Sequence, residues 1–347
     1  MELFGVKFAP LNVPLERRLQ TLSAAAWFIV LAFGDVLGWL LTIFLFLYTG
    51  TFRYLVLLYL VWVYYDRDTS NCGGRRAVRW LQSCGWMRYF CAYFPLKLVK
   101  TTDLDPTRNY LFCSFPHGIL STGVFGAFAT TCLGFEDKFP GLEPRVIVLE
   151  QHFKIPFFRE YVLSMGGCSS SARSINNLLS SKANNPYEGR AVVLIVGGAS
   201  ESLESKPGKY RVLVKRRKGF VKIALKNGTP LVPVLSFGET DIYDQYYAPV
   251  GSYVRKVQDY IRRIVGLAPI IILGRGFFQY TFGLIAQRRP VTVVVGKPVE
   301  VPKIAEPTEE QIDEVHEKFT KSLIELFESN KHKYVKDAES TILETDL

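Results

Sequence analysis

A single histidine stands where acid–base chemistry is easy to arrange. Ser114-Phe115-Pro116-His117-Gly118 follows the apolar run 109–115 and precedes a helix-compatible stretch. A strand-to-helix turn holds an imidazole rigidly and leaves free backbone N–H groups beside it. His117 could therefore take a proton from an alcohol, while donors such as the N–H near Gly118 hold a developing oxyanion. The alternative is a structural histidine, which is the commoner role of a lone His.

A glycine-rich segment is the second candidate. Gly197-Gly198-Ala199-Ser200-Glu201-Ser202 also follows an apolar run directly. Gly197 and Gly198 allow close approach to the backbone, and we expect them to contribute N–H donors. Glu201 would then lie at the carboxyl edge of the sheet, where ligands bind in open α/β sheets. The alternative is an ordinary turn whose Glu caps a helix.

A run of four cations is the third candidate. Lys215, Arg216, Arg217 and Lys218 are consecutive. They could bind the phosphates of a ligand such as coenzyme A, or an anionic membrane surface. The alternative is a solvated charged face, which is the usual fate of such a run.

Short apolar runs that alternate with helical stretches must position these residues. The expected strands are 109–115, 145–151, 191–197, 230–237 and 291–296, and the expected helices are 119–131, 156–165, 172–181, 217–227 and 308–329. Near-continuous Val/Ile/Leu strands separated by helices indicate an α/β fold with a mostly parallel sheet covered on both faces. The segment 241–290 is rich in Tyr, Phe and Gly with scattered Arg, and is either a lipid-facing flap or acyl tunnel, or a buried strand–turn pair.

A long apolar stretch precedes this alternating part. Between Leu19 and Tyr65 the charged residues are Asp35 and Arg53. Because a spanning helix needs about 20 apolar residues, the stretch has room for two passes. Arginines on both flanks favour a hairpin or a re-entrant loop with both ends in the cytosol. Asp35 and Arg53 need partners, since a charge facing lipid is costly.

The composition of the chain excludes several classes of binding site. The net charge of +10 on 347 residues calls for an anionic partner, but no nucleic-acid-binding motif appears, so nucleic acid is not expected. Six spread cysteines form no C-x-x-C pair, and none of the four histidines has metal-ligand spacing with a cysteine. We therefore expect reduced thiols, no metal and no redox cofactor.

Taken in order, these pieces resemble the acyl-CoA:diacylglycerol/monoacylglycerol acyltransferase family, which includes type 2 diacylglycerol acyltransferases, monoacylglycerol acyltransferases and wax synthases. The matching segments run nearly end to end: FAPLNVPLERRLQTL (8–22), YYDRDTSNCGGRR (64–76), YFPLKLVKTTDLDPTRNYLF (93–112), FPHG (115–118), FPGLEPR (139–145), PFFREYVLSMG (156–166), VGGASESL (196–203), RKGFVKIALKNGTPLVPVLSFGE (217–239), GRGFFQY (274–280) and VTVVVGKPVEV (291–301). Each is weak alone, but their order behind a hydrophobic hairpin is specific.

The resemblance implies an endoplasmic-reticulum enzyme that transfers an acyl chain from acyl-CoA to a lipid alcohol. It implies a glycerolipid-acyltransferase-like domain, with the family's essential His at His117 and its Gly-Gly-Ala-x-Glu segment at 197–201. The expected organisation is a cytosolic segment 1–20, a membrane-embedded hairpin 21–65, a cytosolic acyltransferase domain 66–330 and a polar tail 331–347, which we expect to be poorly ordered. Phe44, Leu45, Phe46 and Leu47 resemble the family's neutral-lipid-binding FLxL element.

Two departures from the family pattern bear on the site. Many members carry His where this chain has Phe115, and related glycerophosphate acyltransferases carry Asp five residues after the His, where this chain has Thr122. The tautomer of His117 then needs another carboxylate. We expect Glu201 to supply it, with Glu150 and Glu160 as alternatives.

The expected reaction is direct transfer, with diacylglycerol esterified to triacylglycerol at the endoplasmic reticulum or a lipid droplet. Monoacylglycerol and long-chain alcohol are the alternative acceptors. No G-x-S-x-G elbow is present. The partners are acyl-CoA, a neutral glycerolipid and membrane lipids, and a homo-oligomer is left open. A catalytically inactive lipid-binding membrane protein is the rival hypothesis.

Overall fold

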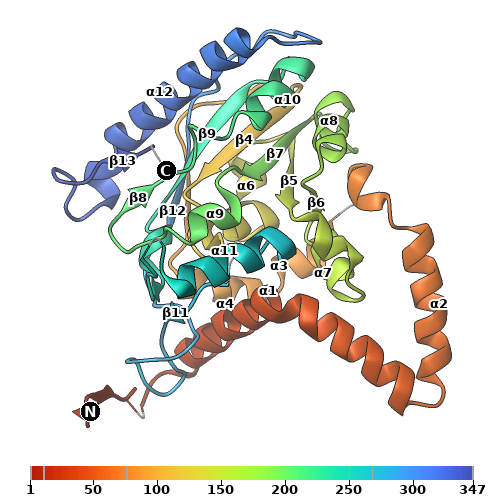
Figure 1. The fold of residues 1–347 in the computed structure, drawn as a ribbon, viewed down its shortest axis with the longest axis vertical. Coiled ribbons are helices and arrows are strands. Elements are labelled where there is room, and N and C mark those ends of the chain that lie inside the picture. Colours follow the sequence, from red (N-terminus) through yellow and green to blue (C-terminus); the bar gives the residue numbers. More distant parts are fainter. Residues whose placement is uncertain (1, 11, 76, 250, 268, 346–347) are drawn as a thin grey trace.

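The computed structural model of the protein describes residues 2–10, 12–75, 77–249, 251–267 and 269–345. A seven-stranded sheet forms its centre (Figure 1). The spatial order is β3 (Lys97–Lys100), β12 (Thr292–Val295), β9 (Leu231–Phe237), β4 (Tyr110–Phe115), β7 (Gly189–Ile195), β5 (Leu142–Val148) and β6 (Gly167–Ser169). The strands from β9 to β6 are parallel to their neighbours, while β12 is antiparallel to β9 and parallel to β3. The expected α/β fold with a mostly parallel sheet is confirmed.

Alternate residues of the central strand enter two separate cores, as the period of two in a strand requires. Leu111, Cys113 and Phe115 lie in the core under α8 (Ala172–Ser180), α10 (Gly219–Asn227) and α12 (Glu309–Tyr334). Tyr110 and Phe112 lie in the other core, under α4 (Gly85–Tyr93), α5 (Thr122–Val124), η2 (Phe125–Ala129) and α6 (Phe135–Lys138). The sheet is therefore covered on both faces.

The five expected strands are all present, but several details differ from the sequence-based expectation. β3 and β6 were not expected, because four and three residues are too few to show a pattern. The expected helix 119–131 is shorter: α5 has three residues and continues as the π-helical turn η2.

The remaining elements outside the N-terminal helices are β1 (Glu2–Leu3), β2 (Val6–Lys7), η1 (Thr69–Asn71), α3 (Arg79–Ser83), η3 (Glu150–Lys154), α7 (Phe158–Ser164), α9 (Gly198–Ser202), β8 (Tyr210–Arg211), η4 (Glu239–Asp241), β10 (Asp244–Gln245), α11 (Tyr253–Val265), β11 (Ile272–Leu273) and β13 (Leu343–Glu344).

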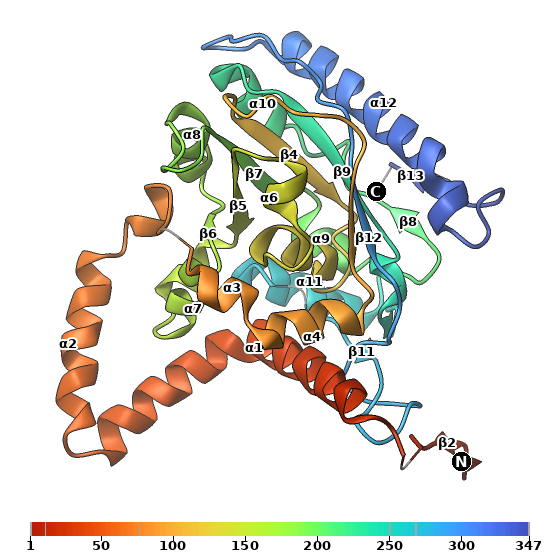
Figure 2. The same cartoon turned by 180° about the vertical axis from the view of Figure 1, so that it is seen from behind.

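Two helices form the apolar N-terminal part, α1 (Leu15–Tyr48) and α2 (Phe52–Tyr65). Helix α1 runs along one end of the molecule, and its last part projects from it together with α2 (Figure 2). Among the described residues, α1 is the one helix long and apolar enough to cross a membrane. The fourteen residues of α2 span about 21 Å, less than the roughly 30 Å of a hydrocarbon core. The expected boundary at 20/21 falls inside α1, whose Ala24, Trp27 and Phe28 are buried in the globular part.

Close contacts fix α1 to the globular part. A Cβ added to Gly38 would lie 2.5 Å from the backbone oxygen of Pro156, and one added to Gly34 would lie 2.4 Å from the ring of Phe158. Between these glycines, Asp35 Oδ1 lies 2.9 Å from His152 Nδ1. Asp35 therefore has a protein partner, as its position in an apolar helix requires.

The C-terminal part is more ordered than the sequence suggested. A capping box of Thr308 and Gln311 forms at the start of α12. However, α12 continues to Tyr334, and β13 pairs with β8. The expectation of a poorly ordered tail over 331–347 is wrong for residues 331–345, because Leu343 is buried in the core; residues 346–347 lie outside the described chain.

Candidate active site

Three neighbouring parallel strands, β9, β4 and β7, bring their carboxyl ends to one edge of the sheet. His117 follows β4, Glu201 lies in α9 directly after β7, and Glu239 begins η4 after β9. The connections between these strands are long, so the three residues are far apart in sequence and meet only through the strand order (Figure 1). This edge is where open α/β sheets bind ligands.

Glu201 holds the backbone of the histidine segment. Its side chain is 2% exposed; one carboxylate oxygen accepts the backbone N–H of His117, and Oε2 accepts that of Leu213 at 2.8 Å. A Cβ on Gly197 would lie 2.0 Å from Oε2, so Gly197 is required to make room for this carboxylate. Gly198 adopts φ +59°, a conformation that favours glycine. Burial raises the pKa of Glu201 to about 7, although the two N–H groups oppose the shift.

The imidazole has a different partner from the one expected. Ser202 Oγ lies 2.9 Å from His117 Nδ1, whereas both oxygens of Glu201 are used by backbone N–H groups. Successive residues of a helical turn point about 100° apart, so Glu201 and Ser202 cannot both face the ring. The prediction that Glu201 contacts the imidazole is therefore wrong for this structure.

The two alternative carboxylates are also engaged elsewhere. Glu150 Oε1 lies 3.2 Å from Lys154 Nζ, and Glu160 Oε1 lies 2.6 Å from Arg159 Nη1. Within the described part of the chain, neither makes a hydrogen bond to His117. The orientation of the imidazole thus depends on a hydroxyl and the backbone.

The contacts of His117 identify its tautomer. Nδ1 lies 3.2 Å from the carbonyl oxygen of Gly118, which can only accept a hydrogen bond. We therefore assign the hydrogen to Nδ1, shared with Ser202 Oγ, which leaves the lone pair on Nε2. Burial lowers the pKa of His117 to about 4, so the ring is neutral near pH 7. A neutral imidazole with a free Nε2 is the form that a general base requires.

Glu239 was not among the expected site residues. It is 1% exposed, and its two carboxylate oxygens accept the backbone N–H groups of Thr122 and Gly123, each at 2.7 Å. A Cβ on Gly118 would lie 2.6 Å from Glu239 Cγ, so Gly118 makes room for Glu239 just as Gly197 does for Glu201. Burial raises the pKa of Glu239 to about 7. The signal that could have revealed it is Gly238-Glu239, which follows an apolar run directly, as the glycine-rich segment with Glu201 follows another.

Two further details restrict what the site can do. Phe115, at the position where many family members carry His, is fully buried and packs against Phe319, so it faces the core. Ser202 and His117 are close enough for a nucleophile–base pair, but Ser202 is only 2% exposed. Ser202 therefore fits a residue that positions the imidazole better than one that attacks a thioester.

The four cations lie beside α9, in the exposed connection from β8 to α10. Arg217 Nη2 lies 3.4 Å from Ser200 Oγ, and Lys218 forms an ion pair with Asp313. The same Ser200 hydroxyl accepts a hydrogen bond from Arg262 of α11, which was not expected. The guanidinium groups of Arg217 and Arg262 therefore both contact Ser200, the residue that precedes Glu201.

The other predicted lipid element lies away from this edge. Phe44, Phe46 and Leu47 are exposed near the end of α1, and Leu45 is half-buried. Both views place that end of α1 away from the sheet (Figures 1 and 2). The 44–47 segment does not adjoin His117.

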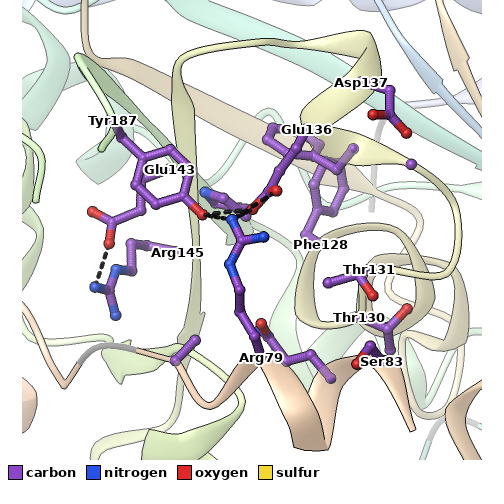
Figure 3. A pocket seen from close by; sticks show the side chains of 15 residues that line it. Arg79, Ser83, Phe128, Thr130, Thr131, Glu136, Asp137, Glu143, Arg145 and Tyr187 are labelled. Carbon is purple, nitrogen blue, oxygen red and sulfur yellow. Dashed lines mark hydrogen bonds and ion pairs between the residues drawn. The ribbon is translucent and has the colours of Figure 1, made fainter. Parts of the chain in front are cut away.

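A separate cavity of about 250 Å³ lies between α3, α6 and β5. Figure 3 shows Arg79 pointing toward Glu136 and Tyr187 across it, and Arg79 Nη2 lies 2.8 Å from Tyr187 Oη. Glu143 and Arg145, from the first half of β5, also line the cavity. It therefore belongs to another part of the sheet than the carboxyl edge.

Comparison with known proteins decides the family. Residues 44–344 match the family described as diacylglycerol acyltransferase. The chain belongs to this family. As a diacylglycerol acyltransferase family member it is 45% identical to 2-acylglycerol O-acyltransferase 1 of Bos taurus, over 95% of this chain and 96% of that one. It is 43% identical to diacylglycerol O-acyltransferase 2 of Dictyostelium discoideum, over 94% and 96%.

The family resemblance and the assignment as an acyltransferase are confirmed. Among solved structures, a 1-acyl-sn-glycerophosphate acyltransferase from Thermotoga maritima has a TM-score of 0.40 at 17% identity, covering 90% of this chain and 96% of that one. A likeness at this level shows neither activity nor substrate.

We predict that Glu201→Gln lowers kcat while the KM for acyl-CoA changes little. An amide can accept only one of the two backbone N–H groups, and leaving a buried donor unpaired costs about 1–3 kcal/mol, which corresponds to a roughly five- to 150-fold loss if it falls on the transition state. The measurement is steady-state kinetics, with the exposed Glu188→Gln as the matched control. Equal kcat values for both variants would contradict the assigned role.

Proposed function

We propose that this family member transfers the acyl chain of acyl-CoA to the free hydroxyl of a neutral glycerolipid, with His117 as general base. The observation that carries the proposal is the neutral imidazole at the carboxyl edge, whose Nδ1 is committed to Ser202 and Gly118. The proton acceptor is then Nε2. An acceptor hydroxyl placed within hydrogen-bond distance of it can be activated.

In the proposed reaction, Nε2 takes the hydroxyl proton as the acceptor oxygen attacks the thioester carbonyl. The N–H of Gly118, which donates to none of the protein groups in the described chain, is available to stabilise the tetrahedral intermediate. The C–S bond then breaks, and the imidazolium returns its proton to the CoA thiolate. Transfer is direct, and no acyl-enzyme forms. That no metal or cofactor is needed remains a prediction.

Acyl-CoA is proposed to bind over the exposed cations. Lys215–Lys218 lie next to α9, and Arg217 lowers the pKa of the buried Glu201 by its charge, against the larger effect of burial. CoA phosphates at this run would place the thioester end toward the sheet edge. Arg262, which contacts Ser200, adds a fifth cation to the expected set.

The acceptor is proposed to be diacylglycerol, with triacylglycerol as product. The alternatives are monoacylglycerol and long-chain alcohol. Two similar relatives support the first two acceptors, because one is named for diacylglycerol and the other for 2-acylglycerol. A protein without catalysis is disfavoured by the pair of buried carboxylates that hold the histidine segment.

The setting is proposed to be the endoplasmic-reticulum membrane or a lipid droplet, with the catalytic part in the cytosol. Helix α1, which is long and apolar enough to cross a membrane, supports this association with a membrane. A cytosolic site would receive acyl-CoA directly.

We predict that microsomes containing the protein release CoA from oleoyl-CoA when diacylglycerol is added, and that His117→Ala abolishes this release. The physical reason is that general acid–base catalysis typically contributes about 10²–10⁴-fold. Monoacylglycerol and long-chain alcohol are tested in parallel. His332→Ala, an exposed histidine of α12, is the control. Near-normal turnover of His117→Ala would refute the mechanism.

Replacing Lys215, Arg216, Arg217 and Lys218 together by Ala should raise the KM for acyl-CoA, and added salt should weaken the difference from the parent protein. A charge-matched control replaces Lys222, Lys226, Lys321 and Lys333, which are also exposed. The control should leave KM unchanged. A similar KM in both variants, with looser membrane binding only in the first, would favour a surface-anchoring role.

A further inference from the structure

Helix α11 packs against the globular part through its polar side. Arg255 pairs with Glu204, and Arg262 donates to Ser200. Gln258 is buried and donates to the carbonyl oxygen of Pro269 at 3.0 Å. Residues 255, 258 and 262 lie on one face of a helix with 3.6 residues per turn. The inward face of α11 is therefore charged and hydrogen-bonded.

The opposite face of α11 is apolar and points outward. Its exposed members are Tyr253, Val257, Tyr260, Ile261 and Ile264. Tyr260 and Ile264, one turn apart, are each 66% exposed. A surface helix of a water-soluble protein normally has the reverse orientation, with its apolar stripe facing the core. A contiguous outward apolar face indicates contact with something other than water.

This face adjoins the parts of the chain that associate with the membrane. A Cβ on Gly266, at the end of α11, would lie 3.3 Å from Gln151, the neighbour of the residue that pairs with Asp35 of α1. Both views place α11 and β11 toward the α1 side of the molecule (Figures 1 and 2).

The segment after α11 continues the apolar surface down to the start of α1. Its exposed side chains are Ile271, Leu273, Phe278, Phe282 and Leu284. The carbonyl oxygen of Phe278 accepts the N–H of Ala9 at 2.8 Å, and that of Phe277 accepts Arg18 Nη1 at 3.4 Å. The apolar surface is therefore continuous with the entry to the membrane helix.

The charges around α11 indicate a phospholipid surface. Lys256 and Arg263 are exposed and flank the apolar face on one side. Helices that lie in the plane of a membrane interface combine an apolar face with such cations, which meet lipid phosphates. Because α1 already holds the protein at a membrane, that membrane is the occupant that reaches this face.

We propose that α11 and residues 271–284 dock in the surface of the membrane that holds α1. α11 contacts the catalytic segment through Arg262–Ser200 and Arg255–Glu204, so the docked helix would hold α9 beside the lipid. Lipid acceptors would then enter from the bilayer next to His117. Only this last consequence rests on the proposed function.

The test uses the full chain in phosphatidylcholine/phosphatidylserine vesicles, with and without dibrominated phosphatidylcholine, which quenches tryptophan in the hydrocarbon region. Ile264→Trp and Tyr260→Trp each add emission to the five native tryptophans. Ile324→Trp is the matched control, because Ile324 is an exposed isoleucine of α12. Helix α12 lies on the opposite side of the sheet region from α1 (Figure 1). We expect loss of most of the emission added at 264 and 260, and no loss of that added at 324.

The proposal would be overturned if brominated lipid quenched the added emission at 264 and 260 no more than the added emission at 324. If that emission is also blue-shifted, another protein surface covers α11, which contradicts membrane docking equally. The quenching needs no turnover, so an inactive protein would still give a decisive result. The proposed reaction is tested by a separate assay, which measures CoA release by the parent protein.

Discussion

The hydrogen bond from the backbone N–H of His117 to the buried carboxylate of Glu201 is the contact on which the site depends. It joins the end of β4 to the turn after β7, so the base is fixed to two neighbouring strands at once. The same carboxylate accepts the N–H of Leu213 and so draws in the segment that leads to the cations. On the other side, Glu239 holds the N–H groups of Thr122 and Gly123. The histidine turn is thus clamped between two carboxylates that have no access to water.

The two buried carboxylates each need a glycine beside them, because a larger residue would collide with the carboxyl side chain. Gly197 leaves room for the carboxylate of Glu201, and Gly118 leaves room for the side chain of Glu239. A carboxylate that accepts two backbone N–H groups fixes loop geometry without occupying the imidazole. The ring is then free to use Nδ1 for Ser202 and Gly118, and Nε2 for a substrate. Burial, which lowers the pKa of His117, keeps the imidazole in the neutral form that this chemistry uses.

The sequence predicted the positions of His117 and Glu201 well, because each follows an apolar run long enough to identify a strand. It could not show Glu239 as a partner, since the adjacency of β9, β4 and β7 follows from strand order and not from sequence spacing. The sequence also led us to assign the contact with the imidazole to Glu201, whereas its neighbour Ser202 makes that contact, because adjacent residues of a helical turn differ by rotation alone. Helix α11 was not expected, because the mixed Tyr, Phe, Gly and Arg content of 241–290 suggested a flap, a tunnel or a strand pair. Only the contacts of Arg255 and Arg262 show which face of α11 is turned outward.

The central claim is that His117 is a neutral imidazole with its hydrogen on Nδ1. Nitrogen NMR of the histidine rings in ¹⁵N-labelled, detergent-solubilised protein tests this directly, since ring shifts report both tautomer and titration. The chain has four histidines, and His117→Gln identifies the signal by its loss. We predict an Nδ1–H tautomer that stays neutral down to about pH 5, because burial holds the pKa near 4. An Nε2–H tautomer, or titration at the ordinary value of about 6.5, would contradict the account.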